Sequence, residues 1–156
     1  MPQSPEIRPL TAADAAATTA VIRAAMLETG ALLPDETDAE LDDLATAFGA
    51  AGSAFFVAAL NGQPVGGAGI VRVASGVCEL RKSYLAPSAR GLGLGRELLG
   101  HCLDEARRLG HRQCVLQTMP SMERARTLYE RAGFRLTEAS EGTCGTRCSV
   151  HMTLDL

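Results

Sequence analysis

The feature that most constrains this chain is residues 78–99, CELRKSYLAPSARGLGLGRELL, where a strand pattern, a proline and a glycine-rich turn lead into a helix pattern. Residues 78–86 have the length of a β-strand, and Pro87 ends it because proline offers no backbone donor to a sheet. Glycines alternate at 91, 93 and 95, and apolar residues then recur at helical spacing as far as Leu109. The stretch therefore predicts a strand, a tight turn and a helix that starts at Gly95.

A glycine-rich turn that opens a helix is a binding site for anions. The first N–H groups of a helix have no partner within it, and the helix dipole favours negative charge there. The groups expected to hold the anion belong to Gly91, Leu92, Gly93, Leu94, Gly95 and Arg96. Arg90, just before the turn, can add a planar cationic group. A Walker loop is excluded because Arg96 follows the last glycine, and a Rossmann fingerprint would need a third glycine at Leu98 or Arg96.

The turn contains the motif Arg-x-x-Gly-x-Gly, at Arg90, Gly93 and Gly95, and the motif LYERAGF follows at 128–134. Together they resemble the coenzyme A signature and the last helix of the GNAT superfamily of N-acetyltransferases. The resemblance is specific over 78–134 and looser elsewhere. It implies an α/β fold with a mixed, mostly antiparallel sheet, helices on both faces, and central strands that splay apart around the pantetheine arm of acetyl-CoA.

Patterns along the rest of the chain predict the same order of elements. Strands are expected at 6–10, 54–60, 65–73, 78–86, 113–118, 134–137 and 148–154, and helices at 12–29, 38–48, 95–109 and after a Ser121 cap. The chain of 156 residues is long enough for one domain and short for two, so 1–156 is expected to be a single acetyltransferase domain.

Composition and charge argue against some classes of binding partner. A formal charge of −3 argues against nucleic acid, and the chain has no apolar run of about 18 residues that would cross a membrane. The first residues lack the basic start and apolar core of a signal peptide, so the five cysteines are expected to be reduced thiols in the cytoplasm. The sequence does not decide the oligomeric state, and a homodimer is one option.

The resemblance assigns roles to residues near the end of the central strand. The backbone N–H of Leu85 would meet the thioester carbonyl and the oxyanion, with Ser83 and Tyr84 lining the pantetheine. Tyr129 would be the acid for the leaving thiolate, although its place on an apolar helix face also suits a core aromatic. Met122 departs from the family pattern, which often has an asparagine there that contacts the pantetheine.

The acceptor must be a neutral amine to attack the thioester. An alkylamine with a pKa of about 10.4 is almost fully protonated at pH 7, so a general base helps. Glu79 precedes Leu85 by six residues, and strict strand alternation would place both side chains on one face. Some GNAT branches use a glutamate at this position as the base, directly or through water. The alternative is a structural ion pair between Glu79 and Arg81 or another arginine.

Two further groups of residues are candidates for binding, one for a metal ion and one for a cationic amine. Cys144, Cys148 and His151 do not have a standard zinc spacing, and alternation separates Cys148 from His151, so no metal is expected. Acidic residues crowd 35–43, at Asp35, Glu36, Asp38, Glu40, Asp42 and Asp43. They suit a solvated helix N-terminus, or an acidic rim that attracts a cationic amine.

The expected function is an N-acetyltransferase that moves an acetyl group from acetyl-CoA to a primary amine by direct attack in a ternary complex. The acceptor would be a small-molecule or peptide amine. The alternative is a non-catalytic acyl-CoA-binding regulatory module, which would bind the cofactor and release no thiol.

Overall fold

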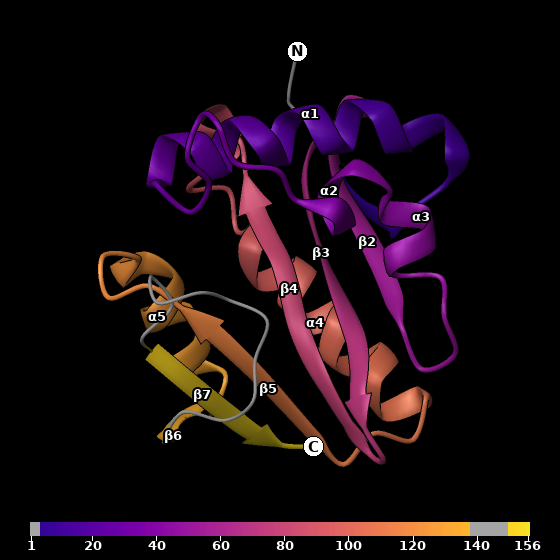
Figure 1. The fold of residues 1–156 in the computed structure, drawn as a ribbon, viewed down its shortest axis with the longest axis vertical. Coiled ribbons are helices and arrows are strands. Elements are labelled where there is room, and N and C mark those ends of the chain that lie inside the picture. Colours follow the sequence, from indigo (N-terminus) through magenta and orange to yellow (C-terminus); the bar gives the residue numbers. More distant parts are fainter. Residues whose placement is uncertain (1–3, 138–149) are drawn as a thin grey trace.

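The computed structural model describes residues 4–137 and 150–156, which form a seven-stranded mixed sheet in the order β1-β2-β3-β4-β5-β7-β6 (Figure 1). The strands are β1 (Pro5–Pro9), β2 (Ala54–Leu60), β3 (Gln63–Ala74), β4 (Val77–Leu85), β5 (Gln113–Thr118), β6 (Arg135–Thr137) and β7 (Val150–Asp155). Among the described strands β4 and β5 alone pair in parallel, and all other neighbours are antiparallel. The expected mixed, mostly antiparallel sheet is confirmed.

Helices cover both faces of the sheet. They are α1 (Ala12–Thr29), α2 (Ala39–Asp42), α3 (Leu44–Ala47), α4 (Leu94–Arg108) and α5 (Glu123–Arg131), with a 3₁₀ turn, η1, at Pro87–Ala89. One core cluster joins α1, α2 and α3 to β2, through side chains such as Ile22, Leu44 and Val57. In the described ranges no helix is long and apolar enough to cross a bilayer.

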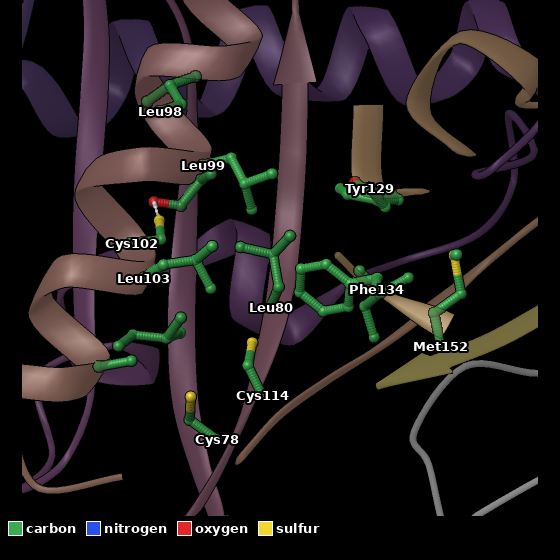
Figure 2. Close-up of a cluster of buried hydrophobic side chains, with 14 of the residues drawn as sticks. Cys78, Leu80, Leu98, Leu99, Cys102, Leu103, Cys114, Tyr129, Phe134 and Met152 are labelled. Atoms are coloured by element: carbon green, nitrogen blue, oxygen red, sulfur yellow. Dashed lines mark hydrogen bonds between the residues drawn. The ribbon is translucent and has the colours of Figure 1, made fainter. Parts of the chain in front are cut away.

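The second core cluster lies between the sheet and the helices α4 and α5 (Figure 2). Leu98 and Leu103 of α4 pack with Leu80 of β4 and Cys114 of β5, and Tyr129 of α5 closes the cluster. Tyr129 belongs to this core and also lines a cavity, so its place on an apolar helix face does not remove it from the candidate site.

The central strands splay apart, as expected. Strands β4 and β5 pair from Val77↔Gln113 to Leu80↔Leu116, and then both continue without further pairing to each other. Figure 1 shows the two strands diverging towards the end of the sheet where α1 lies. Beyond this point the end of β4 lies close to the glycine-rich turn and to α5, since residues of all three line one cavity.

The single helix expected at 38–48 is wrong, because the structure has two short helices there. Asp43 interrupts the helix with φ −146° and ψ 74°. Its carboxylate accepts a hydrogen bond from the N–H of Thr46 at 3.2 Å, and Asp38 caps α2 in the same way through Leu41 at 3.0 Å. Aspartate side chains that bond nearby N–H groups compete with a continuous helix, and here each one begins its own turn.

Replacing Gly69 of β3 with alanine is expected to lower the free energy of unfolding by about 1–3 kcal/mol, which is the usual cost of overpacking. An added Cβ would lie 2.5 Å from Cδ1 of Phe48 and 2.7 Å from Cδ2 of Phe55. These rings already pack edge to face, with centroids 5.0 Å apart. Urea denaturation measures the effect.

Gly100→Ala is the matched control, because a Cβ at this helical glycine meets nothing within 4 Å. It is expected to leave stability unchanged or to raise it by about 0.5–1 kcal/mol. Equal stabilities for the two variants would contradict the close packing described at Gly69.

Candidate active site

A cavity of about 660 Å³ opens between the end of β4, the glycine-rich turn and the start of α5. The expected site residues that line it are Ser83, Tyr84, Leu85, Arg90, Gly91, Gly93, Gly95, Arg96 and Tyr129. Three expected residues do not line it. Leu92 is 45% exposed and Leu94 is 1% exposed beneath the turn, while Glu79 lies deeper in the sheet. A role for Leu92 or Leu94 would therefore use the backbone alone.

The turn has a backbone that glycine allows and other residues resist. Gly91 and Gly93 have φ of +80° and +81°, and Gly93 is the N-cap of the 15-residue helix α4. No side chain caps this helix. A Cβ at Gly91 or Gly93 would meet nothing within 4 Å, so the space in front of the backbone is open. The uncapped N–H groups and the open space fit the approach of a phosphate.

Arg90 is already engaged in the structure. Its Nη1 pairs with Glu28 Oε1 of α1 at 2.7 Å, and its Nη2 donates to the carbonyl oxygen of Leu85 at 3.0 Å. The guanidinium therefore ties the end of α1 to the end of β4 while it lines the cavity. No local motif indicated Glu28, because it is 62 residues away in the chain.

Tyr129 and Tyr84 present two protonated phenols at the cavity. Burial raises the pKa of Tyr129 to about 12, although its hydrogen bond with Ser83 acts in the opposite direction. Burial also raises the pKa of Tyr84 to about 12. At neutral pH both hydroxyl groups can donate a hydrogen bond, and the Tyr129 ring is held against Phe134 with centroids 5.8 Å apart.

Glu79 lies in an ion pair, the alternative that the sequence left open. The residue is 4% exposed, and its Oε1 accepts from Arg81 Nε at 2.5 Å. Its Oε2 accepts from Gln117 Nε2 at 3.3 Å. Arg81 also pairs with Glu40 Oε2 at 2.6 Å. A base role for Glu79 stays a prediction, and it now requires a water or a shift of this carboxylate towards the acceptor.

The expectation that the Glu79 and Leu85 side chains share a face is wrong. Leu85 packs against the core cluster that contains α4. Glu79 lies directly opposite Val71 of the neighbouring strand β3, so the two share a face, and Val71 packs against the cluster of α1, α2 and α3 on the other side of the sheet. A β-bulge explains the difference: Lys82 has φ +57°, and the register of β4 on β3 slips there by one residue. One extra residue in a strand reverses the alternation beyond it.

Met122 lines the cavity and accepts a contact from the Thr118 hydroxyl, with Oγ1 to Sδ at 3.7 Å. The expected cap at Ser121 is wrong, because α5 begins at Glu123 and its N-cap, Met122, makes no side-chain cap. The thioether occupies the position where the family often has an amide. It offers a weak acceptor instead of a donor to a bound pantetheine.

The acidic residues at 35–43 are largely engaged within the protein. Asp38 pairs with Lys82 at 2.8 Å, and Asp42 pairs with Arg23. Glu40 pairs with both Arg81 and Lys82. These contacts favour a structural role over an open acidic rim.

Cys144 and Cys148, two of the three zinc candidates, lie outside the described residues. Over 4–137 and 150–156, no three or more His, Cys, Asp and Glu side chains are grouped so that they could hold a metal ion.

Sequence reasoning missed Thr29 of α1 and Arg124 of α5, which both line the cavity. Arg124 also lines an adjoining groove of about 880 Å³ between α4 and α5, together with Arg96 and Arg131. Nothing in the local pattern singles out these residues, because helix surfaces are commonly rich in arginine. Their place beside the turn depends on how the helices pack.

The profile of the family described as "Acetyltransferase (GNAT) family" matches residues 19–134. The chain belongs to the GNAT family. An Escherichia coli K12 protein described as an uncharacterized N-acetyltransferase, YjgM, is 36% identical over 163 residues, which is 99% of this chain and 97% of the relative. The GNAT match and this relative identify the protein as an acetyl-CoA-dependent acetyltransferase.

Solved structures agree with the GNAT fold. A GNAT acetyltransferase from Staphylococcus aureus Mu50 has a TM-score of 0.85 at 17% identity, with 97% of this chain and 99% of that chain covered. An acetyltransferase from Salmonella typhimurium, YncA, solved with its cofactor acetyl-CoA, has a TM-score of 0.80 at 29% identity, with 97% and 94% covered. The expected GNAT architecture is confirmed.

Proposed function

We propose that this GNAT enzyme moves an acetyl group from acetyl-CoA to a primary amine of a small molecule or peptide, by direct attack in a ternary complex. One observation carries the proposal. The uncapped N-terminus of α4, its glycine-rich turn and the protonated phenol of Tyr129 meet in one cavity where β4 and β5 separate. A phosphate bound at the turn and a group bound near the Tyr129 hydroxyl would therefore share a single cavity.

The turn would hold the pyrophosphate of acetyl-CoA. The space beside Gly91 and Gly93 is open, because an added Cβ would meet nothing there within 4 Å, so a phosphate can approach the N-terminus of α4. Arginine side chains beside this N-terminus would attract the remaining phosphate groups of the cofactor. Arg96 lines both the cavity and the adjoining groove, and Arg124 does the same from α5. The pantetheine arm would then run along Ser83, Tyr84 and Leu85, with the thioester carbonyl at the Leu85 N–H.

Transfer forms a C–N bond and breaks the C–S bond. The neutral amine gives up one proton as the C–N bond forms, and that proton ends on the departing sulfur, so the coenzyme leaves as a free thiol. With a pKa of about 12, Tyr129 is a weaker acid than a thiol of about 8.5, so complete transfer of its proton to the sulfur is unfavourable. Tyr129 would therefore act by donating a hydrogen bond to the developing thiolate.

Glu79 would receive the proton that an ammonium acceptor must lose before attack. Its carboxylate is not part of the cavity lining, so a water between it and the amine would carry the proton. The burial of Glu79 and its bonds to Arg81 and Gln117 hold its orientation for that relay.

The experiment has two parts. Calorimetric titration is expected to show micromolar binding of acetyl-CoA and none of ATP. Thiol release from acetyl-CoA is then measured with a panel of amines: putrescine, lysine, a lysine-containing peptide and an aminoglycoside. Double-reciprocal plots of the initial rate, with both acetyl-CoA and amine varied, distinguish the mechanisms. Intersecting lines would support a ternary complex, and parallel lines would contradict direct attack. Binding without thiol release from any amine would favour the non-catalytic acyl-CoA-binding module.

A further inference from the structure

We propose that Arg81 is a positioning residue for acetyl transfer, which holds the Glu79 carboxylate where β4 and β5 separate and connects it to α2. The inference rests on the proposed function, because it concerns the group assigned there to the amine proton. It goes further in that it assigns a role to a residue that does not line the cavity and that no motif indicated.

Arg81 contacts two glutamates, one on its own strand and one on α2. Its Nε donates to Glu79 Oε1 at 2.5 Å, and its Nη1 pairs with Glu40 Oε2 of α2 at 2.6 Å. The Arg81 side chain is 13% exposed and that of Glu79 is 5% exposed. Burial opposes the charge of Arg81, but the bonds to the two glutamates outweigh it, so its pKa is raised. The guanidinium is therefore a fixed cation between the strand and the helix.

The second carboxylate oxygen of Glu79 accepts a hydrogen bond from β5, the strand that separates from β4 at this point. Gln117 lies one residue beyond Leu116, the last β5 residue that pairs with β4. Its Nε2 donates to Glu79 Oε2 at 3.3 Å. The carboxylate thus receives one donor from β4 and one from β5, at the point where the backbone pairing of these strands ends. This fixes its plane at the base of the gap.

At the β-bulge two consecutive residues of β4, Arg81 and Lys82, both pair with carboxylates at the start of α2. With φ +57° at Lys82, its Nζ reaches Asp38 Oδ2 at 2.8 Å and Glu40 Oε1 at 3.3 Å, while the preceding Arg81 reaches Glu40. Asp38 is also the N-cap of α2. The short helix is therefore anchored to β4 by three ion pairs, and Glu40 is shared between two of them.

Net stability is a weak reason for this arrangement. Partly buried ion pairs recover little more than the cost of removing the charges from water, and apolar residues of the same volume are often as stable. What the network does provide is a single orientation for a buried carboxylate. If Glu79 moves the amine proton, Arg81 serves catalysis through Glu79 and not by itself.

A double-mutant cycle tests this dependence. Glu79→Gln, Arg81→Met and the double variant are compared by kcat at saturating acetyl-CoA, with the panel amine of highest kcat/KM as acceptor. Glu79→Gln is expected to lower kcat about 100-fold and Arg81→Met about 10-fold. The double variant is expected to match Glu79→Gln, with the Kd of acetyl-CoA unchanged throughout.

Additional variants separate positioning from folding. Glu40→Gln removes the far anchor of Arg81 without leaving Glu79 unpaired, and it serves if Arg81→Met does not fold. It is expected to lower kcat about 3-fold and to have no effect in the Glu79→Gln background. Arg23→Met is the matched control, because it breaks the ion pair from α1 to Asp42 of α2 and leaves Glu79 untouched. It is expected to keep wild-type kcat.

Three results would overturn the inference. Losses that multiply in the double variant would mean that Arg81 acts independently of Glu79. A wild-type kcat for both Arg81→Met and Glu40→Gln would mean that neither positions anything. An unchanged kcat for Glu79→Gln would remove Glu79 from the reaction and Arg81 with it. In that last case thiol release by the wild-type enzyme would still leave the proposed acetyl transfer intact.

Discussion

Tyr129→Phe is expected to lower kcat about 100-fold and to leave the Kd of acetyl-CoA within about twofold of wild type. The phenol is buried, its pKa is raised to about 12, and it lines the cavity beside Ser83, so it is a protonated donor across the neutral range. Removal of one preorganised hydrogen-bond donor to a developing charge typically lowers kcat about 10²–10³-fold. The donor is needed as charge develops on sulfur, so its loss affects turnover more than binding.

Tyr84→Phe is the control for this variant. Tyr84 is the other tyrosine of the chain, it lines the same cavity, and its pKa is also raised to about 12. Removal of its hydroxyl is expected to change kcat less than threefold. Stopped-flow thiol release measures kcat, and calorimetry measures the Kd. Similar losses in both variants, or none in Tyr129→Phe, would show that Tyr129 has no special role as a donor.

Gly93→Val is expected to raise the Kd of acetyl-CoA at least 100-fold. Gly93 has φ +81°, where a β-branched residue is strained by about 1–2 kcal/mol, and relief of that strain would turn the first N–H groups of α4 away from the cavity. Each charge-assisted hydrogen bond to a phosphate is worth about 1.5–3 kcal/mol, so the loss of two explains at least a 100-fold change. Calorimetric titration measures it.

Gly62→Val separates strain from binding. Gly62 has φ +82° in the turn between β2 and β3, and a Cβ there also meets nothing within 4 Å. Both variants are therefore expected to lose similar free energies of unfolding, measured with urea, while Gly62→Val binds acetyl-CoA as the wild type does. An unaltered Kd in Gly93→Val would remove the turn from the cofactor site.

Local chemistry within a few residues determined much of the fold. Pro87 ends the central strand, the glycines at 91 and 93 adopt the left-handed backbone that the turn requires, and β5 spans the predicted 113–118. Each feature depends on φ, on a missing N–H or on the spacing of apolar side chains, all of which can be read along the chain. The motif residues around the turn also determined where the cavity would form.

The tertiary structure decided what local patterns do not contain. One extra residue at Lys82 reversed the alternation between Glu79 and Leu85, because side chains beyond a bulge change faces. Arg81 and Glu40 are 41 residues apart, and Arg90 and Glu28 are 62 apart. These long-range ion pairs form only after α1 and α2 pack on the sheet, because an arginine pairs with whichever carboxylate lies near it in space, whatever their separation in sequence.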